Sequence, residues 1–237
     1  MRKIFIIQHT ESGAPGKILF LLEKLGMTFE ILKLFETTEF KVPAQFDGVI
    51  ILGGGMSVND EDIYSWNKPE CEFIRHLVKK EIPLIGICLG GQMIAKAHGA
   101  KIQNNHTPEF GWSEIRPTEF AQNDKFYKIQ NMLPVYQWHY ETFEIPKNAI
   151  RLSYSGACDN QAFKLGERCY GLQYHPETYF ELIQDWVYKE DGVGEIDDLR
   201  AQGFTQFVQT GAMHVALAKK YDRDQNEHLL QLMKVFE

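Results

Sequence analysis

Hydrophobic and polar positions follow two different periods along the first 90 residues of the chain. Short apolar runs at residues 3–9, 29–35 and 47–55 are typical of buried strands, whereas residues 15–27 and 68–82 have apolar positions at helical spacing. A further apolar run at residues 82–87 completes the order strand, helix, strand, strand, helix, strand. This order predicts a doubly wound parallel sheet, whose ligands bind beyond the carboxyl ends of the strands.

The pattern changes at about Gly111. Shorter segments with alternating apolar and polar positions follow, and they predict an antiparallel extension of the same sheet, with His106 in a loop before it. After Glu177 the pattern is mostly helical, most clearly at residues 178–190, 204–221 and 226–236, while residues 190–198 indicate a solvated acidic loop. We therefore predict one domain over residues 1–237, with a helical extension at 178–237 packed on it.

Cys88 is the first candidate for chemistry, because it stands between the apolar run 82–87 and a helix-compatible segment. This is the sequence form of a nucleophile elbow, in which Gly86 and Gly90 avoid collisions at a tight turn. The following helix would direct its first amides at the thiol and favour the thiolate, which is the nucleophilic form.

Two further segments supply partners for Cys88. His175 and Glu177 flank Pro176, and an extended backbone at this spacing puts both side chains on one side, so that the carboxylate can orient the imidazole. The triple glycine at residues 53–55 ends a strand with bare amides suited to an oxyanion hole, to which Leu89 would add the second amide. A phosphate cradle is disfavoured there, because neither of the usual glycine-rich nucleotide motifs is present.

Composition narrows the remaining classes. The 237 residues are 44% hydrophobic and 24% charged with a net charge of −7, which is typical of a globular protein without a nucleic-acid partner. No apolar run is long enough for a membrane span, and the apolar segment near Met1 is too short for a secretory signal, so we expect a cytoplasmic location. The four cysteines have no paired spacing, which favours reduced thiols over disulfides or a zinc site, and no cofactor or metal is expected.

Three strings, ILGGGMSV, GICLGGQ and GLQYHPE, together resemble the class I glutamine amidotransferases. The segments IIQHTESGAPG, FGWSEI and QWHYETFEIP extend the resemblance to the GMP synthase-like branch, from about residue 3 to 180. The resemblance implies a flavodoxin-like α/β fold and hydrolysis of a γ-glutamyl amide.

The resemblance also implies roles for individual residues. Cys88 would be the acylated nucleophile, His175 the general base and acid, and Glu177 the carboxylate that orients it. Oxyanion amides would come from Gly54 and Leu89, and the γ-glutamyl group would bind Gln92. His139 and Glu141 match positions that line the site in this family, although packing and a surface charge explain them equally well.

Three residues depart from the family pattern and bear on the substrate. Gly55 replaces the usual proline of the glycine turn, Gly91 stands where the branch usually has a bulky residue, and Tyr140 replaces a glycine. None of them removes a predicted catalytic group. We expect Gly91 and Tyr140 to affect the space available to the leaving group.

The leading hypothesis is a glutamine amidotransferase-like hydrolase that releases ammonia to water or to a separate synthetase subunit. One alternative is a hydrolase of γ-glutamyl peptides or conjugates, and another is a non-catalytic regulatory or binding module of the same fold. An α/β-hydrolase is disfavoured because the acid follows His175 by two residues. The aromatic tail, with Trp186, Phe204 and Phe207, predicts helix packing and would also suit a homodimer contact.

Overall fold

The parallel half of the sheet follows the predicted order of elements. The computed structural model describes residues 1–37 and 39–237, and its nine strands pair in the order β2-β1-β3-β4-β9-β8-β7-β5-β6. Neighbours among the first five of these strands are parallel. They are β2 (Thr28–Lys33), β1 (Lys3–Gln8), β3 (Gly48–Ile51), β4 (Leu84–Ile87) and β9 (Cys169–Leu172).

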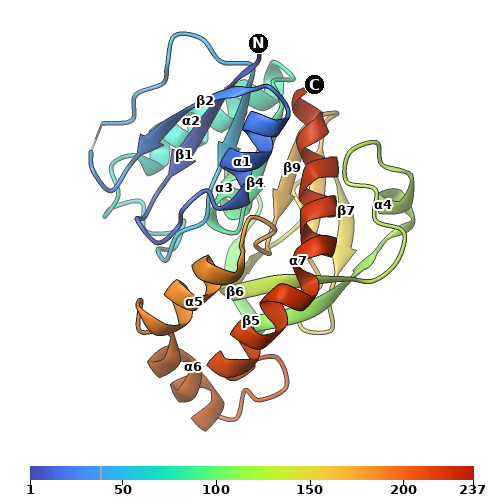
Figure 1. The fold of residues 1–237 in the computed structure, drawn as a ribbon. Coiled ribbons are helices and arrows are strands. Elements are labelled where there is room, and N and C mark those ends of the chain that lie inside the picture. Colours follow the sequence, from blue (N-terminus) through green and yellow to red (C-terminus); the bar gives the residue numbers. More distant parts are fainter. Residues whose placement is uncertain (38) are drawn as a thin grey trace.

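Helices cover both faces of this half, because alternate residues of each strand point to opposite sides. In β1, Ile4 and Ile6 pack with apolar residues of α1 (Lys17–Lys24) and α7 (Gly211–Met233). Figure 1 shows where these two helices lie along the sheet. Phe5 and Ile7 instead join a cluster with α2 (Asn67–Lys79) and α3 (Leu89–Ala97). The doubly wound α/β fold is therefore confirmed.

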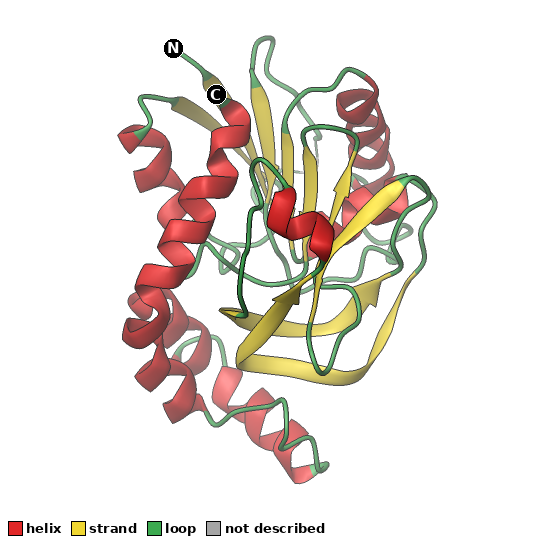
Figure 2. Ribbon diagram, turned by 90° about the vertical axis from the view of Figure 1, so that its right-hand side faces the viewer, coloured by secondary structure: helices red, strands yellow, loops and turns green. Residues whose placement is uncertain are grey.

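The antiparallel extension is also present, but it begins earlier than predicted. It comprises β8 (Ala162–Leu165), β7 (Ala149–Tyr154), β5 (Ile102–Pro117) and β6 (Leu133–Phe143), and the short helix α4 (Glu119–Asn123) connects two of them. Figure 2 shows the long strands β5 and β6 curling away from the parallel half. The prediction of a loop at His106 is wrong, because this residue lies within β5, where the pairing with β6 shifts register between Asn104 and Glu109.

The C-terminal segment is helical, with different boundaries from those predicted. It contains α5 (Phe180–Tyr188), α6 (Gly192–Ala201), α7 and the short 3₁₀ helix η1 (Lys234–Phe236). The acidic loop predicted at residues 190–198 is wrong, since most of it belongs to α6, where Ile196 and Leu199 are buried. The two helical pieces predicted at 204–221 and 226–236 are largely one helix, α7. Thr210 caps its N-terminus, where the side chain accepts a hydrogen bond from the Met213 amide.

These helices pack against the sheet in two places. The end of α7 and η1 place Leu229, Leu232 and Phe236 in the core beside β1, close to the N-terminus (Figure 1). Near α5 and α6, Trp186 and Ile196 share a second cluster with Phe110 of β5. None of the helices in the described ranges is both long and apolar enough to cross a membrane.

Candidate functional site

Cys88 lies in a sharp, strained turn between β4 and α3. Its backbone has φ 51° and ψ −108°, a conformation that costs a residue with a side chain about 1–3 kcal/mol. A Cβ on Gly86 would overlap the Gly90 carbonyl, and one on Gly90 would overlap the Ile51 carbonyl, so both glycines are needed for the close approach of strand and helix. The geometry is that of a nucleophile elbow, and its thiol lines a pocket.

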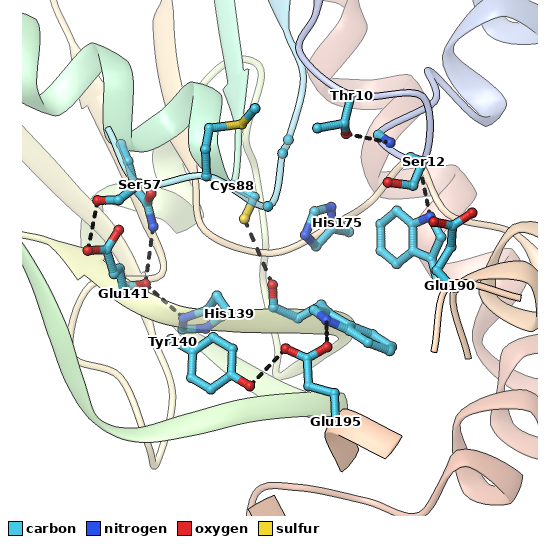
Figure 3. Close-up of a pocket in the computed structure, with 18 of the residues that line it drawn as sticks. Thr10, Ser12, Ser57, Cys88, His139, Tyr140, Glu141, His175, Glu190 and Glu195 are labelled. Atoms are coloured by element: carbon cyan, nitrogen blue, oxygen red, sulfur yellow. Dashed lines mark hydrogen bonds between the residues drawn. The ribbon is translucent and has the colours of Figure 1, made fainter. Parts of the chain in front are cut away.

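His175 and Glu177 meet beside this thiol. The His175 Nδ1 and Glu177 Oε1 atoms are 2.8 Å apart, and both side chains are buried. Burial alone would lower the pKa of His175, but the neighbouring Glu177 carboxylate and Cys88 raise it to about 10. A ring with this pKa is protonated at neutral pH, and it faces Cys88 from across the pocket (Figure 3).

The glycine turn after β3 runs along the same side of Cys88. A Cβ on Gly53 would lie 3.0 Å from His175 Cε1 and 3.5 Å from Cys88 Cβ, and one on Gly54 would lie 2.9 Å from Leu89 Cδ2. Gly54 and Leu89 are therefore neighbours, as the predicted oxyanion hole requires. Among the described residues no side chain caps the start of α3 at Leu89, so its first amides and dipole are left for an anion.

The three predicted substrate-binding residues also line the pocket, and each is held by other residues. Gln92 donates from Nε2 to the Glu141 carbonyl at 3.1 Å and to Gln173 Oε1 at 3.3 Å. Glu141 accepts a hydrogen bond from the Ser57 hydroxyl at 3.0 Å, and His139 Nδ1 lies 3.0 Å from the Glu141 carbonyl. The amide nitrogen of Gln92 is thus already engaged, which leaves its carbonyl oxygen for a ligand.

A buried carboxylate behind His139 was not predicted from the sequence. Glu109 has no exposed surface, and its Oε2 lies 3.1 Å from His139 Nε2. Ser113, Ser155 and Gln161 also donate hydrogen bonds to this carboxylate. Both ring nitrogens of His139 therefore lie within hydrogen-bond distance of oxygen atoms, the Glu141 carbonyl on one side and the Glu109 carboxylate on the other. The only signal in the sequence was an acidic residue within an otherwise apolar stretch of β5.

A second buried pair, also not predicted, supports the glycine turn from below. His9 Nε2 lies 3.0 Å from Glu70 Oε2, and neither side chain is exposed to solvent. The His9 ring also packs against Trp66, with ring centroids 4.7 Å apart. A Cβ on Gly54 would lie 3.2 Å from His9 Cβ, so this pair sits directly under the turn.

The pocket has a volume of about 490 Å³ and is completed by the C-terminal helices. Trp186 lines the pocket, and its Nε1 donates a hydrogen bond to the Ser12 carbonyl at 2.8 Å. The sequence predicted only helix packing for this residue, not a place in the pocket wall. Glu195 accepts hydrogen bonds from the Tyr140 hydroxyl at 2.8 Å and from Trp138 Nε1 at 3.2 Å. Tyr140 therefore bears on the pocket as expected.

Gly91, in contrast, does not reach the pocket lining among the described residues. A Cβ at this position would lie 2.5 Å from the Leu172 carbonyl oxygen, so Gly91 allows α3 to pack closely on β9. The expectation that Gly91 sets the space for a leaving group is therefore wrong.

The other three cysteines have surroundings unlike that of Cys88. Cys71, Cys158 and Cys169 are buried free thiols, and burial raises the pKa of Cys71 to about 11 and that of Cys158 to about 12. Burial also raises the pKa of Cys169. All three are thus held as inert thiols. Within residues 1–37 and 39–237 no group of three or more histidine, cysteine or carboxylate side chains could hold a metal ion.

The chain is similar to known proteins over most of its length. The family model for glutamine amidotransferase class-I matches residues 16–188. One subunit of the glutamine-hydrolysing GMP synthase of Methanococcus vannielii is 34% identical over 168 residues, which cover 70% of this chain and 76% of that protein. The putative glutamine amidotransferase-like protein YfeJ of Salmonella typhimurium is 26% identical over 213 residues, 88% of both chains.

Solved structures extend the similarity to the whole chain. A glutamine amidotransferase from Methylobacillus flagellatus has a TM-score of 0.89 and 27% identity, covering 100% of this chain and 94% of that one. Some matched relatives are much longer: the similarity to the GMP synthase of Borrelia garinii spans 30% of that protein. The chain belongs to the class I glutamine amidotransferases, an enzyme family, and within it to the GMP synthase-like branch.

Proposed function

We propose that this protein hydrolyses the γ-amide of glutamine through Cys88, His175 and Glu177. The observation that carries the proposal is the position of His175, which is hydrogen-bonded to Glu177 on one side and faces Cys88 on the other, inside a pocket. Class I family membership supports the same reaction. Since the pKa of His175 is raised to about 10, its ring already carries the proton that the leaving nitrogen needs, next to the sulfur that attacks the carbonyl.

The reaction begins when the Cys88 thiolate forms a bond to the γ-carbonyl carbon, which moves an electron pair onto the oxygen. The amides of Gly54 and Leu89 stabilise this oxyanion, and each such donor is worth about 3–4 kcal/mol of barrier. Collapse of the intermediate breaks the C–N bond as His175 gives its proton to the leaving nitrogen. A Cys88 thioester and ammonia result.

Water completes the cycle. It loses a proton to His175 and adds to the thioester, and the C–S bond then breaks to give glutamate and the Cys88 thiolate. Throughout, Glu177 holds the ring orientation and offsets the imidazolium charge. Gln92, Glu141 and His139 border the space for the glutamyl group, and we assign them to its binding.

The acceptor of the ammonia is a separate question. Relatives described as individual subunits of a GMP synthase support delivery to a synthetase on a partner chain, whereas release to water needs no partner. We also propose that residues 178–237 form an extension of a single domain and complete the pocket through Trp186 and Glu195. Cytoplasmic location and a homodimer remain predictions from the sequence.

A second candidate function is hydrolysis of larger γ-glutamyl conjugates, favoured by a pocket of about 490 Å³, a size that encloses ligands much larger than glutamine. The retained triad geometry disfavours a purely regulatory module.

The test of glutamine hydrolysis is the release of ammonia and glutamate from glutamine, which should appear in equal amounts with the purified protein. Cys88→Ala should abolish both, whereas Cys158→Ala, which removes a buried thiol elsewhere, should retain them. Equal activity of Cys88→Ala and the unaltered protein would contradict the proposal.

A further inference from the structure

The wall of the pocket next to His175 comes from the C-terminal helices. The ring of Trp186 meets the His175 ring edge-on, with centroids 5.0 Å apart and planes at 83°. Glu190 and Glu195 follow in the chain and also line the pocket. In Figure 3, Glu190 lies beyond His175 near Ser12, whereas Glu141 and Ser57 lie on the opposite side of Cys88.

This wall must face the leaving amine if the proposed function holds. His175 would protonate the leaving nitrogen, so that nitrogen has to lie within hydrogen-bond reach of the ring. Whatever the nitrogen carries then extends past Trp186 toward Glu190 and Glu195. The glutamyl part is left with the other side of the pocket, near Gln92 and Glu141.

The two charged side chains that the C-terminal segment contributes to this wall, Glu190 and Glu195, are both acidic. In the described part of the chain, no lysine or arginine lines the pocket. Four glutamates do: Glu141, Glu177, Glu190 and Glu195. Glu177 is matched by the His175 imidazolium, whereas Glu195 accepts its hydrogen bonds from the neutral donors Tyr140 and Trp138. Among the residues that the structure describes, the exposed side chain of Glu190 has no hydrogen-bond or ion-pair partner.

Aromatic rings stand beside these carboxylates. Trp138, Tyr140 and Trp186 all line the pocket. Aromatic faces attract ammonium groups, and the attraction grows when the cation is partly removed from water. Carboxylates and aromatic rings together are the surroundings that bind an organic cation. They oppose an anion, because a negative group at this wall would meet Glu190 and Glu195, and the one imidazolium next to it, that of His175, is already paired with Glu177.

We propose that the pocket selects γ-glutamyl amides whose amine part carries a second, positively charged amino group, as in the γ-glutamyl amide of a diamine. The inference rests on the proposed function and names its substrate class. Cleavage follows the same steps: the C–N bond breaks, His175 protonates the released nitrogen, and water converts the thioester to glutamate. The products are glutamate and the diamine, with no other reactant.

The test compares three γ-glutamyl amides of matched length, formed from diaminobutane, pentylamine and aminopentanoic acid. Their tails end in a positive, a neutral and a negative group. We expect kcat/KM to fall roughly tenfold from the first to the second, and again to the third, at low ionic strength. The preference should shrink at high salt, because partly exposed charges are screened.

Two variants distinguish the effect of the carboxylates on this wall from a general loss of activity or stability. In Glu190→Gln/Glu195→Gln the ratio of kcat/KM between the positive and the neutral amide should fall toward one. Glu181→Gln is the matched control, because Glu181 is exposed on α5, in the same C-terminal segment, and lies outside the pocket lining. This control should keep the ratio of the unaltered protein.

Binding to Cys88→Ala, measured by calorimetry, gives a readout that does not need catalysis. The positive amide should bind most tightly. Equal or tighter binding and cleavage of the neutral amide would overturn the charge selection while leaving the hydrolase intact. If no amide and no glutamine is cleaved, yet the positive amide binds best, charge selection stands as binding and the proposed hydrolysis fails. If none is cleaved and none binds preferentially, both fail.

Discussion

Replacing Glu177 by glutamine tests how the charge of this carboxylate keeps the His175 ring protonated. Glutamine has nearly the same shape and retains an oxygen that can accept the hydrogen bond from His175 Nδ1, which now spans 2.8 Å. Only the negative charge is lost. Because Glu177 makes the largest contribution that raises the pKa of His175, that pKa should fall from about 10 toward neutrality in this variant.

The size of the effect follows from the pKa of His175. The interval between the ordinary 6.5 and about 10 corresponds to ~5 kcal/mol of preference for the imidazolium. Cys88 provides part of this, so we assign ~2–4 kcal/mol to Glu177. At about 1.4 kcal/mol for each factor of ten, kcat should fall roughly 30- to 1,000-fold, with KM little changed.

The assay is steady-state release of glutamate from glutamine as a function of pH, together with an NMR titration of the His175 ring. The alkaline limb of the kcat profile reports loss of the proton from His175, and in Glu177→Gln it should move to lower pH. Glu181→Gln controls for the loss of a carboxylate from the surface. If Glu177→Gln keeps kcat within threefold, or if the pKa of His175 does not fall, the reasoning is refuted.

Three further predictions concern the glycine turn and the buried histidines. Gly54→Ala should lower kcat at least tenfold, because the added Cβ would lie 2.7 Å from Met56 Sδ. Gly55→Ala should stay active, because no atom lies within 4 Å of a Cβ added there. Equal rates for the two variants would contradict this prediction. Burial lowers the pKa of His214 and His228 to about 4, so unfolded chains bind more protons between about pH 6.5 and 4. Their contribution to the free energy of unfolding should therefore fall by up to ~3 kcal/mol per histidine as the pH drops from about 6.5 to 4, and His228→Gln should flatten that slope in urea titrations. Glu70→Ala should lower the free energy of unfolding by roughly 3–5 kcal/mol, because it leaves His9 buried without its partner; a loss below 1 kcal/mol would argue against the pair.

The parallel half of the fold was predictable because local patterns determine it. The apolar runs at β1, β3 and β4 are buried on both faces, which makes them continuous in the sequence. The turn at Cys88 is likewise local, since Gly86 and Gly90 stand within two residues of it.

The predictions of secondary structure were wrong where contacts with distant residues override the local preference for a loop. Residues 190–198 contain glycine and acidic residues typical of a loop, yet Ile196 packs into a cluster with β5 and stabilises α6. His106 looked like a loop residue because the bulge in β5 interrupts the alternation of its neighbours.

Among the hydrogen-bonded pairs of the site, that of His175 with Glu177 was predictable because one motif contains both partners, whereas Cys88 and the glycine turn were connected with them through the family resemblance. The pairs Tyr140 with Glu195 and His139 with Glu109 join residues 55 and 30 positions apart, and nothing in the local sequence connects them. The same holds for His9 and Glu70, which are 61 positions apart. Such pairs form only when the fold brings β5, β6, α2 and α6 together.

The central claim is that Cys88 forms a covalent bond with a γ-glutamyl carbonyl. The most direct measurement is intact-mass spectrometry of the purified protein after exposure to a diazo-ketone analogue of glutamine, followed by peptide mapping. We predict one adduct per chain, located on Cys88, absent from Cys88→Ala and slowed by added glutamine. An unmodified protein, or an adduct that persists in Cys88→Ala, would contradict the claim.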